Sequence, residues 1–162
     1  MPQTLTYAAL LRQSGLERSD ALALFRHATG RDRAWLIAHD QDEVSPEDAA
    51  AFHPLAERRR AGEPVAYLTG EREFFGRSFA VSPTVLIPRP ETELLVELAL
   101  THASQGARVL DLGCGSGCIP VTLKLERPDL QVTAVDISTP SLAMAQRNAT
   151  RLGAVIRFME SD

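Results

Sequence analysis

The chain has 162 residues, of which 44% are hydrophobic and 23% are charged. This length suits one domain of ordinary size or two small ones, and the composition excludes a wholly disordered, collagen-like or coiled-coil chain. The net charge of −4, from 17 basic and 21 acidic residues, gives no electrostatic footprint for nucleic acid or for an anionic membrane.

The sequence also bears on compartment and metal binding. No apolar run approaches the roughly 20 residues needed to span a bilayer, and the first residues lack the basic-then-apolar order of a signal peptide. Two cysteines, Cys114 and Cys118, cannot close a tetrahedral metal site, and no histidine stands at ligand spacing. We therefore expect reduced thiols buried as small apolar side chains, no metal site, and a cytoplasmic protein.

The first 70 residues have the pattern of short amphipathic helices. Helices are predicted to start near Leu5, after Ser19-Asp20, at Asp32 and at Ser45-Pro46. Short amphipathic helices gain stability by packing together, so we expect a small bundle with Phe25 and Trp35 in its core. The run Arg58–Arg60 is expected to complement a helix dipole and stay solvated, with contact to a protein or RNA as the alternative.

A hairpin and another helix follow the bundle. Aromatic residues flank Gly76 on both sides, which predicts a β-hairpin that turns at this glycine. Pro90 then opens a helix whose apolar residues repeat at helical spacing. Glu91 and Glu93 lie at the start of this helix, where they either favour its dipole or reach a ligand.

The last third alternates strands with helices. Strands are predicted at 108–112, 132–136 and 155–159, with helices at 118–127 and 140–152 between them. This order is typical of a parallel sheet with crossover helices. The expected fold class is therefore α/β, with a small N-terminal helical bundle, a β-hairpin linker and three strands of a parallel sheet.

A glycine-rich turn after the first of these strands is the most informative feature. It follows Asp111-Leu112 and has the form G-x-G-x-G, with the residues Gly113, Cys114, Gly115, Ser116 and Gly117. Glycines let a ligand approach the backbone closely, and the next helix presents unpaired N–H groups at its start. Asp136 ends the second strand, where an acid accepts hydrogen bonds from the two hydroxyls of a ribose.

This loop has three possible interpretations: a dinucleotide site, a site for another cofactor, or a turn with a purely structural role. A dinucleotide site prefers G-x-G-x-x-G, whose third glycine position is occupied here by Cys118. The form found here, preceded by an acid, resembles motif I of the S-adenosylmethionine-dependent class I methyltransferases, which have a Rossmann-like fold. This resemblance implies that the glycine loop contacts the methionine and ribose part of S-adenosyl-L-methionine and that Asp136 holds the ribose.

A closer resemblance lies outside the loop. The segments Gly62–Gly70, Glu73–Gly76 and Val85–Glu93 resemble the linker of the HemK/PrmC-type protein-(glutamine-N5) methyltransferases. That resemblance implies a helical release-factor-docking domain over 1–70, a hairpin linker over 71–88 and a partial methyltransferase domain over 89–162. The family methylates the glutamine of the Gly-Gly-Gln motif in peptide chain release factors, a modification that belongs to translation termination.

One departure from the family concerns the acceptor site. The family signature Asn-Pro-Pro-Tyr is absent from this sequence. We therefore expect an N-terminal portion of such an enzyme, with no catalytic residue of its own and no activity alone. Asp162 resembles the acid that the family places near the adenine. A binding module that docks a release factor without methylating it, and an amino-methyltransferase acting on nucleic acid, are the alternatives; the acidic net charge argues against the second.

The family order of strands has a consequence for stability. It makes the strand at 108–112 central, so that this strand would pair with a fourth strand. An unpaired apolar strand is an aggregation hazard. We expect the last third of the isolated chain to be marginally folded, or to self-associate through that edge.

Overall fold

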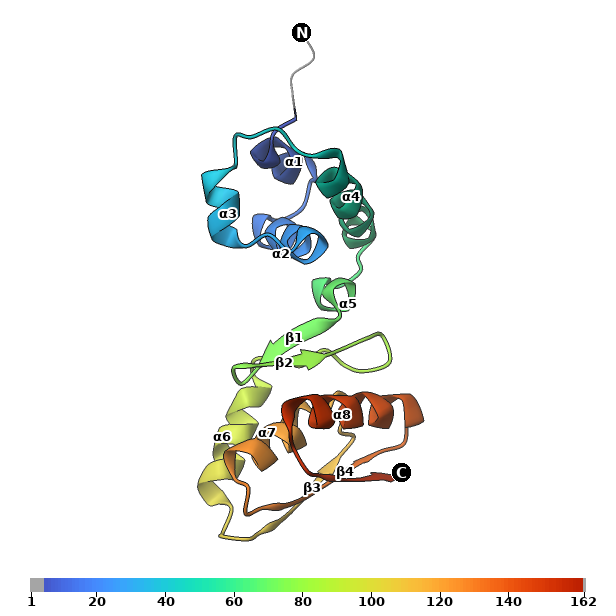
Figure 1. The fold of residues 1–162 in the computed structure, drawn as a ribbon. Helices are drawn as coiled ribbons and strands as arrows, with labels where there is room; N and C mark the ends of the chain where they lie inside the picture. Colours follow the sequence, from blue (N-terminus) through green and yellow to red (C-terminus); the bar gives the residue numbers. More distant parts are fainter. Residues whose placement is uncertain (1–4, 162) are drawn as a thin grey trace. The chain divides into compact units, whose positions relative to one another are not determined.

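The computed structural model describes residues 5–161 and divides the chain between Thr69 and Gly70 into two compact units (Figure 1). We call residues 5–69 the helical unit and residues 70–161 the α/β unit. Asp162 lies outside the described residues.

The helical unit packs five helices around aromatic and aliphatic side chains. Its helices are α1 (Tyr7–Gln13), α2 (Arg18–Thr29), α3 (Arg33–Ala38), α4 (Pro46–Arg60) and α5 (Val65–Thr69). The largest fully buried side chains of its core are Phe25, Phe52 and Leu24, and Trp35 packs against this core in a partly buried position. The predicted bundle is therefore present. The segment of α5, in contrast, was expected only as a linker.

The helix starts follow the predicted capping residues in two cases out of three. The side chains of Asp32 and Ser45 accept hydrogen bonds from the backbone N–H groups of residues three positions ahead, at 2.7 and 3.1 Å. The prediction at Ser19-Asp20 is wrong by a few residues, because α2 begins at Arg18 without a side-chain cap. Asp20 instead forms an ion pair with Arg59 at 2.8 Å, a contact between distant parts of the sequence.

The run Arg58–Arg60 was predicted to stay solvated, but its side chains form ion pairs and a hydrogen bond within the helical unit. Arg58 forms an ion pair with Glu63 at 2.5 Å, and Arg59 pairs with Asp20. Arg60 donates to the carbonyl of Ser14 at 3.5 Å. The first two guanidinium groups thus tie the end of α4 to neighbouring segments of the same unit.

The α/β unit begins with the predicted hairpin. Strands β1 (Glu71–Phe74) and β2 (Arg77–Ala80) pair antiparallel. The turn residues Phe75 and Gly76 both have positive φ, 51° and 70°, as a two-residue hairpin of the right twist requires. Helix α6 (Thr92–His102) follows, starting two residues after Pro90.

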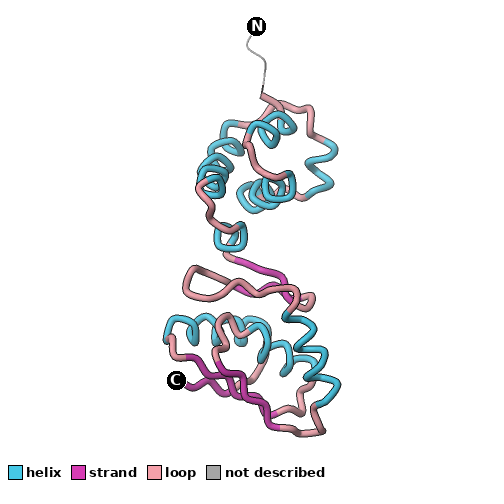
Figure 2. Tube along the Cα trace, turned by 180° about the vertical axis from the view of Figure 1, so that it is seen from behind, coloured by secondary structure: helices cyan, strands magenta, loops and turns pink. Residues whose placement is uncertain are grey.

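Three parallel strands form the sheet of this unit. The elements are β3 (Arg108–Leu112), α7 (Cys118–Glu126), β4 (Gln131–Asp136), α8 (Thr139–Leu152) and β5 (Arg157–Glu160). The strand order is β3-β4-β5. Seen from opposite sides, α7 and α8 lie on the same side of this sheet (Figures 1 and 2). The predicted α/β class and the parallel pairing are confirmed.

Strand β3 is an edge strand in the described part of the chain, because it pairs there with β4 alone. Leu110 and Leu112 on this strand are 59% and 71% exposed. Among the described residues, every helix is too short or too polar to cross a bilayer.

Candidate functional site

The predicted glycine loop lies at the carboxyl end of the sheet, between β3 and α7. It is fixed to the neighbouring strand: the N–H groups of Gly113 and Cys114 both donate to the carbonyl of Val135, at 2.8 and 2.9 Å. Gly117 closes the loop by donating to the carbonyl of Cys114 at 2.8 Å. The loop therefore has a defined conformation that β4 imposes.

The three loop glycines have different surroundings. Gly113 and Gly115 have φ of 75° and 53°, and a Cβ atom built on either would meet no atom within 4 Å. Gly117 also has a positive φ, 79°, but its Cβ would lie 2.9 Å from the Cβ of Ala145 on α8. The first two glycines thus leave open space above the loop, whereas the third allows close packing of the loop on α8.

Two carboxylates belong to this end of the sheet. Asp136 is buried, and its two oxygens accept hydrogen bonds from the N–H groups of Gly115 and Ser138, both at 2.9 Å. Asp111 is partly buried, and its buried Oδ2 has no hydrogen-bond partner among the described residues. Burial, and then the charge of Asp136, raise the pKa of Asp111. Neither carboxylate forms an ion pair within residues 5–161.

The two cysteines are buried free thiols, as predicted. Burial, followed by the charges of Asp136 and Asp111, raises the pKa of Cys114 to about 12. Burial raises the pKa of Cys118 to about 11, although a hydrogen bond with Ser116 opposes this shift. Both thiols are therefore neutral near pH 7 and are poor nucleophiles. Within residues 5–161, His, Cys, Asp and Glu side chains form no group of three that would hold a metal ion.

Asn148 on α8 supports the loop, and sequence reasoning missed it. Its side chain is fully buried and donates to the carbonyls of Ser116 and Ala80, both at 2.9 Å. Its Oδ1 accepts from the N–H of Ala80 at 2.8 Å. One amide thus links the hairpin strand β2 to the glycine loop. A signal was available, because Asn148 is a polar residue on the apolar stripe formed by Leu142, Ala145 and Ala149.

Of the two acids at the start of α6, Glu93 has a structural contact and Glu91 does not cap the helix. Glu93 accepts a hydrogen bond from the N–H of Phe75 at 2.9 Å and so ties the hairpin turn to the helix. This contact accounts for Glu93 as a structural residue. Glu91 is exposed at the N-cap of α6 without a capping hydrogen bond.

Comparisons with known proteins agree on one family. Residues 4–70 match the family model of the PrmC N-terminal domain, and residues 90–162 match that of the methyltransferase small domain. The chain is 55% identical over 156 residues to a release factor glutamine methyltransferase of Bordetella pertussis, covering 94% of this chain and 57% of that protein. It is 44% identical over 154 residues to the Escherichia coli protein of the same name, covering 94% and 56%.

Solved structures give a weaker likeness. The Pyrococcus abyssi tRNA (uracil-54, C5)-methyltransferase in complex with S-adenosyl-L-homocysteine is 16% identical, with a TM-score of 0.48, over 57% of this chain and 23% of that one. A S-adenosylmethionine-dependent methyltransferase from Geobacter sulfurreducens is 33% identical, with a TM-score of 0.39, over 46% and 30%. Both TM-scores are below 0.5.

The chain spans about half the length of the curated relatives it matches. Within that length the two family models together cover the helical unit and all of the α/β unit from α6 onward. Over its own length the chain is thus similar to the release factor glutamine methyltransferases, and it matches a PrmC N-terminal domain and a methyltransferase small domain.

Proposed function

We propose that this chain binds S-adenosyl-L-methionine and serves N5-methylation of the glutamine in the Gly-Gly-Gln motif of peptide chain release factors. The curated relatives carry the name release factor glutamine methyltransferase, which supports the substrate class. The proposal for the cofactor is supported separately, by the residues around the glycine loop.

The observation that carries the cofactor proposal is the unpaired carboxylate oxygen of Asp111. A buried polar atom without a partner carries a free-energy penalty, and a second carboxylate, Asp136, adds repulsion. A ligand that brings positive charge relieves both. S-adenosylmethionine does so, since it carries an ammonium group and a sulfonium, and the sulfonium supplies the activated methyl group. The pyrophosphate of a dinucleotide would instead add negative charge beside Asp111.

The residues present fit this group. An ionised carboxylate offers about four acceptor positions, and Asp136 uses two of them for backbone N–H groups. Two positions remain for the hydroxyls of a ribose. The open space above Gly113 and Gly115 admits the body of the ligand. Cys114 and Ser116 have buried side chains, so their contribution to binding would come from their backbone.

Calorimetric titration of the chain with S-adenosylmethionine tests this proposal. We expect saturable binding that Asp136→Ala weakens at least about tenfold, because hydrogen bonds to a charged group contribute about 1.5–3 kcal/mol each. Glu160→Ala, which removes an exposed acid of β5, is the matched control. Binding of a nicotinamide dinucleotide in place of S-adenosylmethionine, or equal affinity of the two variants, would contradict the cofactor assignment.

The protein substrate needs its own experiment. The helical unit is proposed to dock the release factor, and a pull-down with the release factor tests this contact. Transfer of a radioactive methyl group to the glutamine of Gly-Gly-Gln, lost when that glutamine is replaced, tests the reaction. Methyl transfer by the 162-residue chain would exclude a role in docking alone, whereas binding without transfer is the result expected for a sequence without the Asn-Pro-Pro-Tyr signature. Methylation of RNA or DNA in place of the release factor would refute the assignment. We also propose that the chain acts in the cytoplasm.

Self-association through β3 is also part of the proposal. An unpaired strand edge with exposed Leu110 and Leu112 favours pairing with a second copy. Sedimentation velocity over a range of protein concentrations is expected to show a dimer, and Leu112→Lys is expected to restore the monomer. A monomer at every concentration would exclude this pairing.

A further inference from the structure

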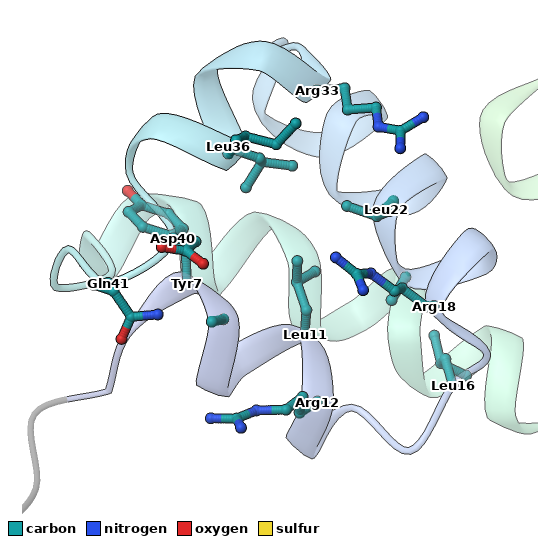
Figure 3. Close-up of a pocket in the computed structure, with 13 residues that line it drawn as sticks. Tyr7, Leu11, Arg12, Leu16, Arg18, Leu22, Arg33, Leu36, Asp40 and Gln41 are labelled. Atoms are coloured by element: carbon teal, nitrogen blue, oxygen red, sulfur yellow. The ribbon is translucent and has the colours of Figure 1, made fainter.

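The helical unit contains a pocket that the methyl-transfer site does not use. It has a volume of about 750 Å³ and lies among α1, α2 and α3 (Figure 3). Leucine and isoleucine side chains from all three helices form its apolar lining; they include Leu11, Leu22, Leu36 and Ile37. Ile37 is 69% exposed, whereas Leu36 is buried, so the recess opens to solvent beside Ile37. An apolar recess that remains solvated favours an apolar ligand group.

Positive charge surrounds this apolar lining. Arg12, Arg18 and Arg33 line the pocket together with one acid, Asp40. In Figure 3 the Arg18 side chain points into the pocket, whereas Arg12 and Arg33 lie nearer its edges. All three arginines are exposed, and none forms an ion pair within residues 5–161.

Three other arginines of the same unit behave differently. Arg31, Arg58 and Arg59 each pair with a carboxylate of the unit, at 2.5–2.9 Å. The unit as a whole is not basic, because residues 5–69 hold eight arginines against ten Asp and Glu, a net charge of −2. Within residues 5–69, five arginines form no ion pair; three of them line the pocket, and the other two are Arg26 and Arg60.

We propose that this pocket binds an acidic amphipathic segment of a protein partner. An apolar side chain of the segment would occupy the recess, and flanking carboxylates would pair with Arg12, Arg18 and Arg33. Guanidinium groups match carboxylates in shape and charge, and apolar anchors with charged flanks are a recurrent mode of peptide recognition. A nucleic acid or a membrane would meet the net negative charge of the unit. The inference rests on the proposed function in one respect, namely that the helical unit receives a protein.

Two labelled peptides test the inference by fluorescence anisotropy on the whole chain. Both form an amphipathic helix with leucines on one face; one carries glutamates and the other carries lysines on the opposite face. We expect the acidic peptide to bind at least about tenfold more tightly than the basic one, with an affinity that falls as salt rises. Equal binding of the two peptides, or no saturable binding of the acidic one, would overturn the inference.

Three variants locate the binding. Arg18→Glu and Ile37→Asp change exposed side chains of the pocket, so the fold tolerates them, and each is expected to weaken the acidic peptide at least about tenfold. Arg26→Glu, an exposed arginine of α2 outside the pocket, is the matched control and should leave the affinity unchanged. Equal effects of Arg18→Glu and Arg26→Glu would show nonspecific attraction and contradict the site.

Other occupants give distinct results. Displacement of the acidic peptide by single-stranded RNA in an Arg18-dependent manner would replace the proposed partner with a nucleic acid. A dimer that Ile37→Asp dissociates would identify a second copy of the chain. Titration with S-adenosylmethionine stays informative in every case, because the glycine loop lies in the other unit. Failure of the pocket proposal is therefore distinguishable from failure of the cofactor proposal.

Discussion

Two carboxylates, one in each unit, show how differently the two regions treat a buried charge. Asp48 in the helical unit accepts hydrogen bonds from the hydroxyl of Tyr7 at 2.6 Å and from Arg31 at 2.9 Å. Burial alone would raise the pKa of Asp48, but these hydrogen bonds outweigh it, so that the pKa is lowered. Asp111 in the α/β unit has a buried oxygen without a partner, and its pKa is raised.

This difference indicates that Asp48 stabilises the fold, whereas Asp111 is a candidate for contact with a ligand. The Oδ2 of Asp48 accepts from Tyr7 of α1 and from Arg31 in the loop between α2 and α3, so Asp48 acts as a structural residue that joins these segments to α4. Asp111 is held at the carboxyl end of β3 in an ionisable state that the protein itself does not compensate. A partly buried acid with a raised pKa beside an open loop is a candidate for a binding site.

Two native probes separate the units experimentally. Trp35 is the only tryptophan of the sequence and lies in the helical unit, so its fluorescence follows unfolding there. The only two cysteines, Cys114 and Cys118, are buried in the α/β unit, so their reaction with a thiol reagent follows unfolding of that unit. Each prediction below is expected to change one probe and not the other.

The largest effect is expected from Asn148→Asp. The new carboxylate would face the carbonyls of Ala80 and Ser116 without a donor, which costs about 3 kcal/mol or more at pH 7. Thiol reactivity should rise, while the Trp35 transition stays in place. Gln146→Glu makes the same amide-to-acid change at an exposed position of α8 and should have little effect. Equal stability of the two variants would remove Asn148 as the support of the loop.

Asp48→Ala should weaken the helical unit by about 2–3 kcal/mol, because it leaves the Tyr7 hydroxyl without its acceptor. Glu47→Ala is the control, since Glu47 also lies in the first turn of α4 but is exposed. The Trp35 transition in urea measures the difference. The contribution of Asp48 is present above its ordinary pKa of 3.8 and is lost as the pH falls through its lowered folded-state pKa. A pH-independent difference between the variants would argue against the ion pair.

Gly117→Ala and Gly153→Ala form a matched pair in the α/β unit. Both glycines have φ near +80°, so both variants incur the strain of a left-handed backbone, about 1–2 kcal/mol. Only the new Cβ at Gly117 meets another atom, at 2.9 Å in Ala145. We expect Gly117→Ala to lose about 1–2 kcal/mol more than Gly153→Ala in thiol-monitored unfolding. Equal losses would mean that α8 yields to the extra methyl group.

The smallest expected change is a gain in stability and not a loss. Asp111→Asn should stabilise the ligand-free α/β unit by about 1 kcal/mol or less, because a neutral amide is less costly to bury than an unpaired carboxylate. The raised folded-state pKa of Asp111 means that its ionisation lowers stability as the pH rises through that pKa, so the gain should vanish below the ordinary value of 3.8. The same variant should lose affinity for S-adenosylmethionine. A loss of stability at pH 7 would show that Asp111 has a partner in solution.

The sequence predicted the elements of the α/β unit more closely than its supporting contacts. The loop glycines and Asp136 follow from local spacing, and the strand at 108–112 is found with the same bounds. Asn148 and Asp48 could not be assigned, because their roles depend on partners 68 and 41 residues away. Ser19-Asp20 failed as a cap for the same reason, since the pairing of Asp20 with Arg59 is tertiary. Local patterns report secondary structure, whereas the satisfaction of buried polar groups is a property of the packed molecule.

The anchoring of the glycine loop has a kinetic consequence. The Val135 carbonyl and the Asp136 carboxylate already hold Gly113, Cys114 and Gly115 through hydrogen bonds within the described chain. The conformational entropy of the loop is therefore lost during folding, and an incoming ligand meets a surface that needs no ordering step. In stopped-flow mixing, the observed association rate should rise in proportion to ligand concentration without reaching a plateau.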